Sequence, residues 1–97
     1  MKVTNLNGTS DNACSCGSWL KHWERFNYAR QSKPTICPAC GRNFTEVGAH
    51  VKKYQSDDLD WYIVPLCKSC NNQSSSTVLD IGNCSLAPAS RFSTCGY

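Results

Sequence analysis

The chain has 97 residues, with ten Lys and Arg against seven Asp and Glu, a formal net charge of +3, and eight cysteines. This length fits one domain spanning residues 1–97. Such a domain buries only about 60 to 68% of the surface of its unfolded chain, so cross-links help it fold. No apolar run approaches the length of a membrane span, and no signal-peptide pattern is present, so we expect a cytoplasmic protein without a membrane partner. In that reducing compartment, the cysteines predict metal ligands rather than disulfides.

The first third of the chain predicts one helix. Residues 1–13 are polar and are expected to form a flexible arm or an edge segment. Ser18 is a good N-cap for a helix that starts at Trp19. The helical repeat then places four side chains on one stripe that covers a core: Trp19, Trp23, Phe26 and Arg30.

The middle of the chain predicts a turn, two strands and a helix. Pro38 and Gly41 favour a tight zinc knuckle within the motif ICPACGRN. The stretch FTEVGAHV predicts a strand with His50 on one face and Ala49 on the other. WYIVPL predicts a second, buried strand. CKSCNNQSSS begins a helix, and a short strand is expected at residues 78–81. We expect an N-terminal segment at 1–35, a zinc-knuckle core at 36–76, and a tail at 77–97 that packs back.

Two Cys-x-x-Cys pairs predict a structural zinc site. Zinc prefers a tetrahedron of thiolates and imidazoles, and each pair offers two ligands from one turn. The predicted ligands are Cys37, Cys40, Cys67 and Cys70.

A second zinc site is also predicted. Its ligands are Cys14, Cys16 and Cys95 together with either His22 or Cys84, and we favour His22 because Cys84 lies in an irregular segment. The alternative role for His22 is a partly buried histidine bonded to the backbone.

Basic residues dominate residues 21–53. Seven Lys and Arg stand there against only Glu24 and Glu46, which suits a nucleic-acid partner but also fits an ordinary solvated face. The candidates for contact with phosphate are Arg42, Lys52 and Lys53.

The segment CPACGRNFTEVGAHV through WYIVPLCKSCNN, residues 37–72, resembles the HNH endonuclease family in its zinc-stabilised ββα-metal form, a variant of the treble clef. The resemblance implies an α+β fold with a small zinc-stabilised ββα core, to which this chain adds an N-terminal amphipathic helix. It also implies His50 as general base and Asn71 as a helix ligand of Mg²⁺ or Mn²⁺.

The chain departs from that family at two positions. Ala49 stands where an Asp is usual, and Tyr62 stands where an Asn is common. Glu46, or an Asp of the loop at 57–60, would have to supply the missing oxygen ligand. We therefore expect a zinc-binding HNH-like module that binds nucleic acid or a nucleic-acid-handling protein, with catalysis lost or weak.

Two alternatives remain open. One is a metal-dependent HNH-type endonuclease that uses His50. The other is a small phage-type inhibitor of a host enzyme, because CSCGSWLKHW also looks like small uncharacterised bacterial and phage proteins. In that case exposed tryptophans would anchor the interface, whereas buried ones would only be part of the core. The exposure of Trp19, Trp23 and Trp61 therefore distinguishes the inhibitor from the other two functions.

Overall fold

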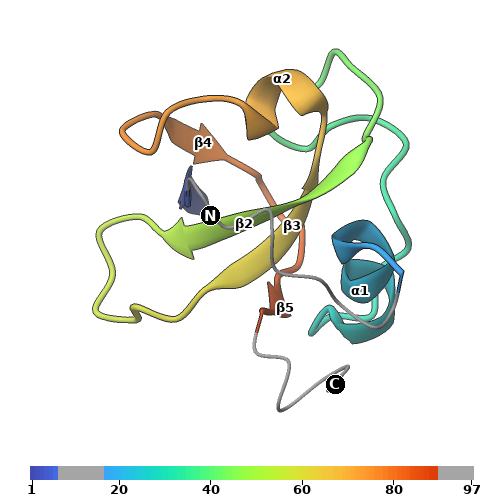
Figure 1. The fold of residues 1–97 in the computed structure, drawn as a ribbon, viewed down its shortest axis with the longest axis horizontal. Helices are drawn as coiled ribbons and strands as arrows, with labels where there is room; N and C mark the ends of the chain where they lie inside the picture. The colour runs from blue at the N-terminus through green and yellow to red at the C-terminus, as the bar shows by residue number, and fades with distance from the viewer. Residues whose placement is uncertain (7–16, 90–97) are drawn as a thin grey trace.

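The computed structural model describes residues 1–6 and 17–89, which form an antiparallel sheet with helices packed on it (Figure 1). The sheet has five strands in the order β4-β1-β2-β3-β5. In chain order the elements are β1 (Lys2–Asn5), α1 (Trp19–Phe26), β2 (Val47–Lys53), β3 (Tyr62–Leu66), α2 (Lys68–Asn71), β4 (Val78–Asp80) and β5 (Ala87–Pro88). The predicted α+β class is confirmed. No helix of the described residues has the length and apolar character needed to cross a membrane.

The hairpin of β2 and β3 is the centre of the sheet. His50 lies opposite Ile63, and Ala49 lies opposite Val64. Directly paired residues of neighbouring strands point to the same face, so Ala49 and His50 face opposite sides, as the alternation predicts. The strand begins at Val47, three residues later than expected.

β1 corrects the interpretation of the N-terminus. Residues 2–5 are neither a flexible arm nor an edge, because β1 pairs with β2 on one side and with β4 on the other. Val3 is fully buried on the core face. With only one strongly apolar side chain, this short strand has little local signal, and its structure depends on two partners that follow much later in the chain.

α1 begins where the sequence predicts. The Ser18 side chain caps it by accepting a hydrogen bond from the Lys21 N–H at 3.1 Å. The helix is shorter than the stripe, however, because it ends at Phe26. Arg30 therefore lies beyond the helix, with φ of 54°, and is not part of the covering face.

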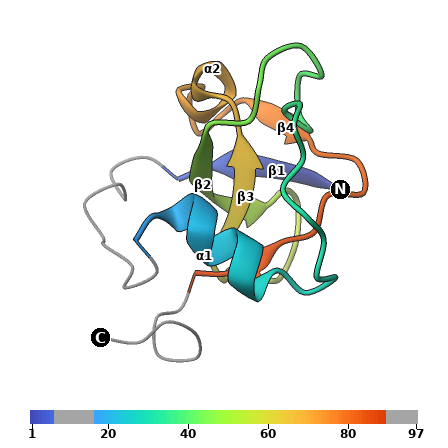
Figure 2. The ribbon, with the colours of Figure 1, turned by 90° about the vertical axis from the view of Figure 1, so that its right-hand side faces the viewer.

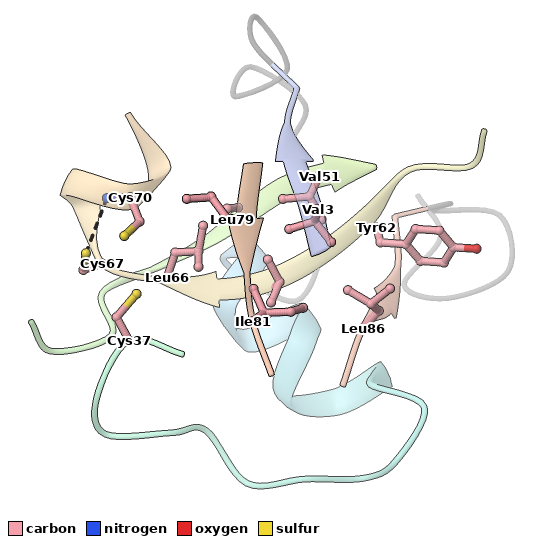
Figure 3. Packing of buried hydrophobic residues seen from close by; sticks show 12 residues of the cluster. Val3, Cys37, Val51, Tyr62, Leu66, Cys67, Cys70, Leu79, Ile81 and Leu86 are labelled. Carbon is pink, nitrogen blue, oxygen red and sulfur yellow. Dashed lines mark hydrogen bonds between the residues drawn. The ribbon is translucent and has the colours of Figure 1, made fainter. Parts of the chain in front are cut away.

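Apolar side chains pack on both faces of the sheet. The larger cluster joins Val3, Val51, Val64, Leu66, Leu79, Ile81 and Leu86 with Cys37, Cys67 and Cys70. In Figure 3 the three cysteines lie at one end of this cluster, and Tyr62 lies at the other. The smaller cluster lies under α1, where Trp23 packs against Ile63 and Ala87. Figure 2 shows α1 crossing in front of β2 and β3.

Gly48 sets how closely α1 approaches the sheet. A Cβ atom at this position would lie 2.4 Å from the Trp19 carbonyl carbon and 2.5 Å from the Leu20 nitrogen. These are backbone atoms of the first turn of α1, so they cannot move aside without shifting the helix.

We predict that Gly48→Ala lowers the free energy of unfolding by about 1 to 3 kcal/mol, the usual range for overpacking a close contact. Urea denaturation followed by tryptophan fluorescence measures the effect. An unchanged midpoint would show that α1 is not held against the sheet at this point. Ala29→Ser, at an exposed position beyond α1, is the control and is expected to stay within about 0.5 kcal/mol of the parent.

Candidate metal centre

Cys37 and Cys40 occupy a tight turn that follows the loop after α1. Ile36 and Phe44 form an antiparallel bridge that closes this turn. The Gly41 N–H donates to the Cys37 carbonyl at 2.9 Å, and Gly41 has φ of 68°, a conformation that side chains rarely adopt. The sequence CPACG therefore folds as the predicted knuckle, with both sulfurs on one side of the turn.

Cys67 and Cys70 lie where β3 passes into α2. Cys67 is the N-cap of this single-turn helix, and its sulfur accepts a hydrogen bond from the Cys70 N–H at 3.4 Å (Figure 3). One helical turn separates the two cysteines, so their side chains leave the helix on the same side.

The four sulfur atoms of Cys37, Cys40, Cys67 and Cys70 all lie within 4.8 Å of one another. The Cys40 and Cys67 sulfurs are 3.8 Å apart. Zinc–sulfur bonds of about 2.3 Å in a regular tetrahedron require sulfur–sulfur distances of about 3.8 Å. A disulfide would need about 2.05 Å, and all four thiols are free. The spacing of this cluster could therefore hold a metal ion such as zinc.

Hydrogen bonds favour the thiolate forms of two of these cysteines. The backbone N–H groups of Asn43 and Arg42 lower the pKa of Cys40 to about 6. Burial alone would raise the pKa of Cys67, but hydrogen bonds from the Cys70 N–H and the Asn43 side chain outweigh it and leave that pKa below its usual value. Burial and the neighbouring thiols raise the pKa of Cys70 instead. A metal ion would have to displace the proton of Cys70.

Two asparagines that sequence reasoning missed support the cluster. The Asn43 amide donates to the Cys67 sulfur at 3.6 Å. The buried Asn5 amide donates to the carbonyls of Cys70 at 2.9 Å and Gln73 at 3.0 Å, which ties β1 to the end of α2. Polar residues of this kind carry no sequence signal for such a role, because their partners lie far along the chain.

The second predicted site is only partly visible. Cys14, Cys16 and Cys95 lie outside the described residues. His22 is fully buried, and its Nε2 lies 2.7 Å from the Pro88 carbonyl. This contact corresponds to the alternative role of His22, a histidine bonded to the backbone. Cys84 is half-buried and bonds to the Ser85 carbonyl. Among the described residues, neither joins a group of three potential ligands.

The two residues proposed for catalysis differ in their burial. His50 is only 7% exposed, and its ring stacks edge-on against Trp19 of α1 at 4.5 Å. Burial, reinforced by the charge of His22, lowers the pKa of His50 to about 4. Asn71 is half-buried in α2, and its carbonyl accepts from Asn5 at 3.3 Å.

Two of the carboxylates considered as magnesium ligands, Glu46 and Asp58, have other partners. Glu46 accepts from the Lys68 N–H and pairs with the Lys68 ammonium group. Asp58 pairs with Lys53 and accepts from the Tyr62 hydroxyl, and these hydrogen bonds lower the pKa of Asp58 to about 2. In the described residues, no carboxylate joins His50 in a potential ligand group.

The predicted phosphate contacts differ in their surroundings. Lys53 points to the core side, where its ammonium group lies 2.9 Å from Asp58 and 5.1 Å from the centre of the Tyr62 ring. Lys52 is exposed on the opposite face, and Arg42 is exposed just after the turn that carries Cys37 and Cys40. Lys53 is therefore already paired, whereas Lys52 and Arg42 form no ion pair among the described residues.

The tryptophans are mostly core. Trp23 is fully buried, and Trp19, also on α1, is partly buried and packs against the same cluster. Only Trp61, at 47% exposure, presents a large surface.

Comparison of the chain with known proteins finds no matching family model, no similar curated protein and no similar solved structure.

We predict that His50 makes the fold acid-sensitive. Its pKa is about 4 in the fold against an ordinary 6.5, so the unfolded chain takes up the proton first and stability falls as the pH drops from 6.5 toward 4. The full effect is up to about 3 kcal/mol. The measurement is the free energy of unfolding at pH 7 and pH 4.5 for the parent and for His50→Gln. Acid acts on the cysteines of both proteins, so the contribution of His50 is the difference between the two losses of unfolding free energy from pH 7 to pH 4.5. Equal losses in the parent and in His50→Gln would contradict the prediction.

Proposed function

We propose that Cys37, Cys40, Cys67 and Cys70 bind one structural zinc ion, and that the chain is a zinc-stabilised module that acts by binding rather than by catalysis. The observation that carries the proposal is the placement of four sulfurs within 4.8 Å of one another. Thiolates at tetrahedral spacing favour zinc over magnesium or calcium, which prefer oxygen ligands.

The order of elements supports kinship with the treble-clef arrangement of HNH proteins. A knuckle with two ligands leads into the β2–β3 hairpin, and the second ligand pair stands at the start of α2. The resemblance stays a proposal, because α2 is a single turn and the surrounding sheet includes β1, β4 and β5 as well.

The burial of His50 supports a non-catalytic function. A general base must reach a water molecule beside the phosphodiester, but the His50 ring is covered by Trp19. Ala49 offers no metal ligand, and Glu46 and Asp58 already form ion pairs with lysines. A cleavage reaction would require α1 to leave the sheet.

We propose nucleic acid, or a protein that handles nucleic acid, as the partner. Support comes from the exposure of Arg42 and Lys52, two of the predicted phosphate contacts. Trp23 is fully buried and Trp19 is partly buried, which leaves Trp61 as the tryptophan best suited to anchor a protein interface and gives less support to the host-enzyme inhibitor.

The zinc proposal is tested by metal content. We expect Cys70→Ser to lose one zinc per chain relative to the parent and to lose cooperative unfolding, because structural zinc contributes about 10 kcal/mol or more to domains of this kind. Cys84→Ser is the matched control, since its sulfur is not in the cluster, and it should retain this zinc. The measurements are elemental analysis of the purified chain and thermal unfolding with and without a chelator. Full zinc content in Cys70→Ser would contradict the assignment.

The non-catalytic proposal is tested by cleavage. We expect no nicking of supercoiled plasmid with added Mg²⁺ or Mn²⁺, and the same result for His50→Ala. Nicking by the parent that His50→Ala abolishes would establish the endonuclease alternative instead.

A further inference from the structure

A groove of about 320 Å³ lies beside β2, on a part of the chain that neither the cysteine cluster nor the hairpin core uses. We call it the β2 groove. Its floor includes Thr4 of β1 and Lys52 of β2, which lie directly opposite each other in the sheet. One end is closed by the loop after β2, and the other by the turn before β4. The volume suits a small polar ligand or one unit of a polymer.

The β2 groove is positively charged. Nine residues line it, including Lys52 and Lys53, and none of them is acidic. Lys53 is already paired with Asp58, but Lys52 is exposed and forms no ion pair within the described part of the chain. Asp80 of β4 does not line the groove, and its carboxylate lies 3.7 Å from the N-terminal amine. Lys52 is therefore available to an anion.

Hydroxyl groups lie at the end of the groove nearest β4. Ser75 and Ser76 are the central residues of a turn closed by a hydrogen bond from the Thr77 N–H to the Ser74 carbonyl at 3.0 Å. In such a turn the N–H groups of the central residues are not used by the closing bond. Serine hydroxyls, turn N–H groups and a lysine are the donors that bind phosphate oxygens.

Apolar side chains form the opposite end. Tyr54 is 39% exposed and Leu59 is 75% exposed, and both line the groove. Tyr54 follows Lys52 by two residues, so continuing the strand alternation past Lys53 would place both on one face. An exposed aromatic ring close to a basic side chain provides a stacking surface for a base together with a contact for its phosphate.

We propose that the β2 groove binds single-stranded nucleic acid, with a phosphate at Lys52 and the Ser75–Ser76 turn and a base against Tyr54 and Leu59. This inference deepens the proposed function by locating the binding surface and naming the form of the nucleic acid. A duplex keeps its bases paired and stacked, so it cannot place one on Tyr54. An acidic peptide would satisfy Lys52 but would leave the aromatic end unused.

The test is fluorescence anisotropy with a labelled oligothymidylate, titrated at several salt concentrations. Lys52→Gln should lower the slope of log affinity against log salt by about 0.7, the value for one phosphate contact on a single strand. Tyr54→Ala should weaken binding by about fivefold or more, the loss expected from one stacked base. The unlabelled duplex should compete poorly.

Two matched variants test whether the loss of affinity is specific to the groove or follows from removing any positive charge or any exposed aromatic ring. Lys33→Gln removes the same charge from an exposed loop position, and Tyr28→Ala removes another exposed ring, 66% exposed and outside the groove. Both should bind as the parent does. Equal losses in Lys52→Gln and Lys33→Gln would overturn the proposal, as would absence of binding.

Other ligands are distinguished in the same assay. Competition by polyglutamate or by phosphatidylserine vesicles that matches competition by oligothymidylate would also overturn the proposal, because it would show a site for any anion.

Failure of the groove proposal can be distinguished from failure of the zinc assignment. Lys52→Gln and Tyr54→Ala lie away from the cysteines and should retain the zinc content and unfolding temperature of the parent. A zinc-loaded, folded chain that does not bind the oligonucleotide refutes the groove alone. A folded chain without zinc that still binds through Lys52 and Tyr54 refutes the zinc assignment alone.

Discussion

The convergence of four sulfur atoms is the constraint on which the rest of the structure depends. Cys40 and Cys67 are 27 residues apart in the chain, yet their sulfurs are 3.8 Å apart. Backbone N–H groups stabilise negative charge on Cys40, and several thiolates at this distance would repel one another without a cation among them. A zinc ion would remove that repulsion. It would also close the loop between the knuckle and α2, which stabilises a domain too small to rely on its apolar core alone.

The two faces of the sheet have different functions in the fold. One face carries the larger apolar cluster, which runs from the cysteines to Tyr62 (Figure 3). The other receives α1, which comes so close at Gly48 that no side chain fits there. His50 belongs to this second interface, and its contact with Trp19 explains both its burial and its lowered pKa. A histidine at a position that resembles a catalytic base is therefore part of the packing of a helix. What remains accessible beside β1 and β2 is the β2 groove, with its lysine, serines and tyrosine.

Local patterns predicted the parts of the molecule whose causes are local. The knuckle follows from CPACG, the start of α1 from the capping hydroxyl of Ser18, and the alternation of β2 from its apolar spacing. The prediction was wrong at two places, one where strand pairing decides the structure and one at the end of α1. Lys2–Asn5 has too little apolar character to be recognised as a strand, and the sheet places it between β4 and β2. Arg30 was assigned to the helical stripe, but Asn27 ends α1 three residues earlier by bonding its side chain to the Trp23 carbonyl.

The sequence by itself predicted which four cysteines come together in one cluster, because two Cys-x-x-Cys pairs at turns are typical of a shared metal site. It could not determine the roles of Asn5, Gly48 or His50. Each of these depends on a partner distant in the sequence: the end of α2 for Asn5, the first turn of α1 for Gly48, and the Trp19 ring for His50. Only the tertiary structure decided which element covers which face of the sheet, and therefore that the histidine is buried while Lys52 stays exposed. Residue types record the chemistry that is available, whereas burial and neighbours decide which of it is used.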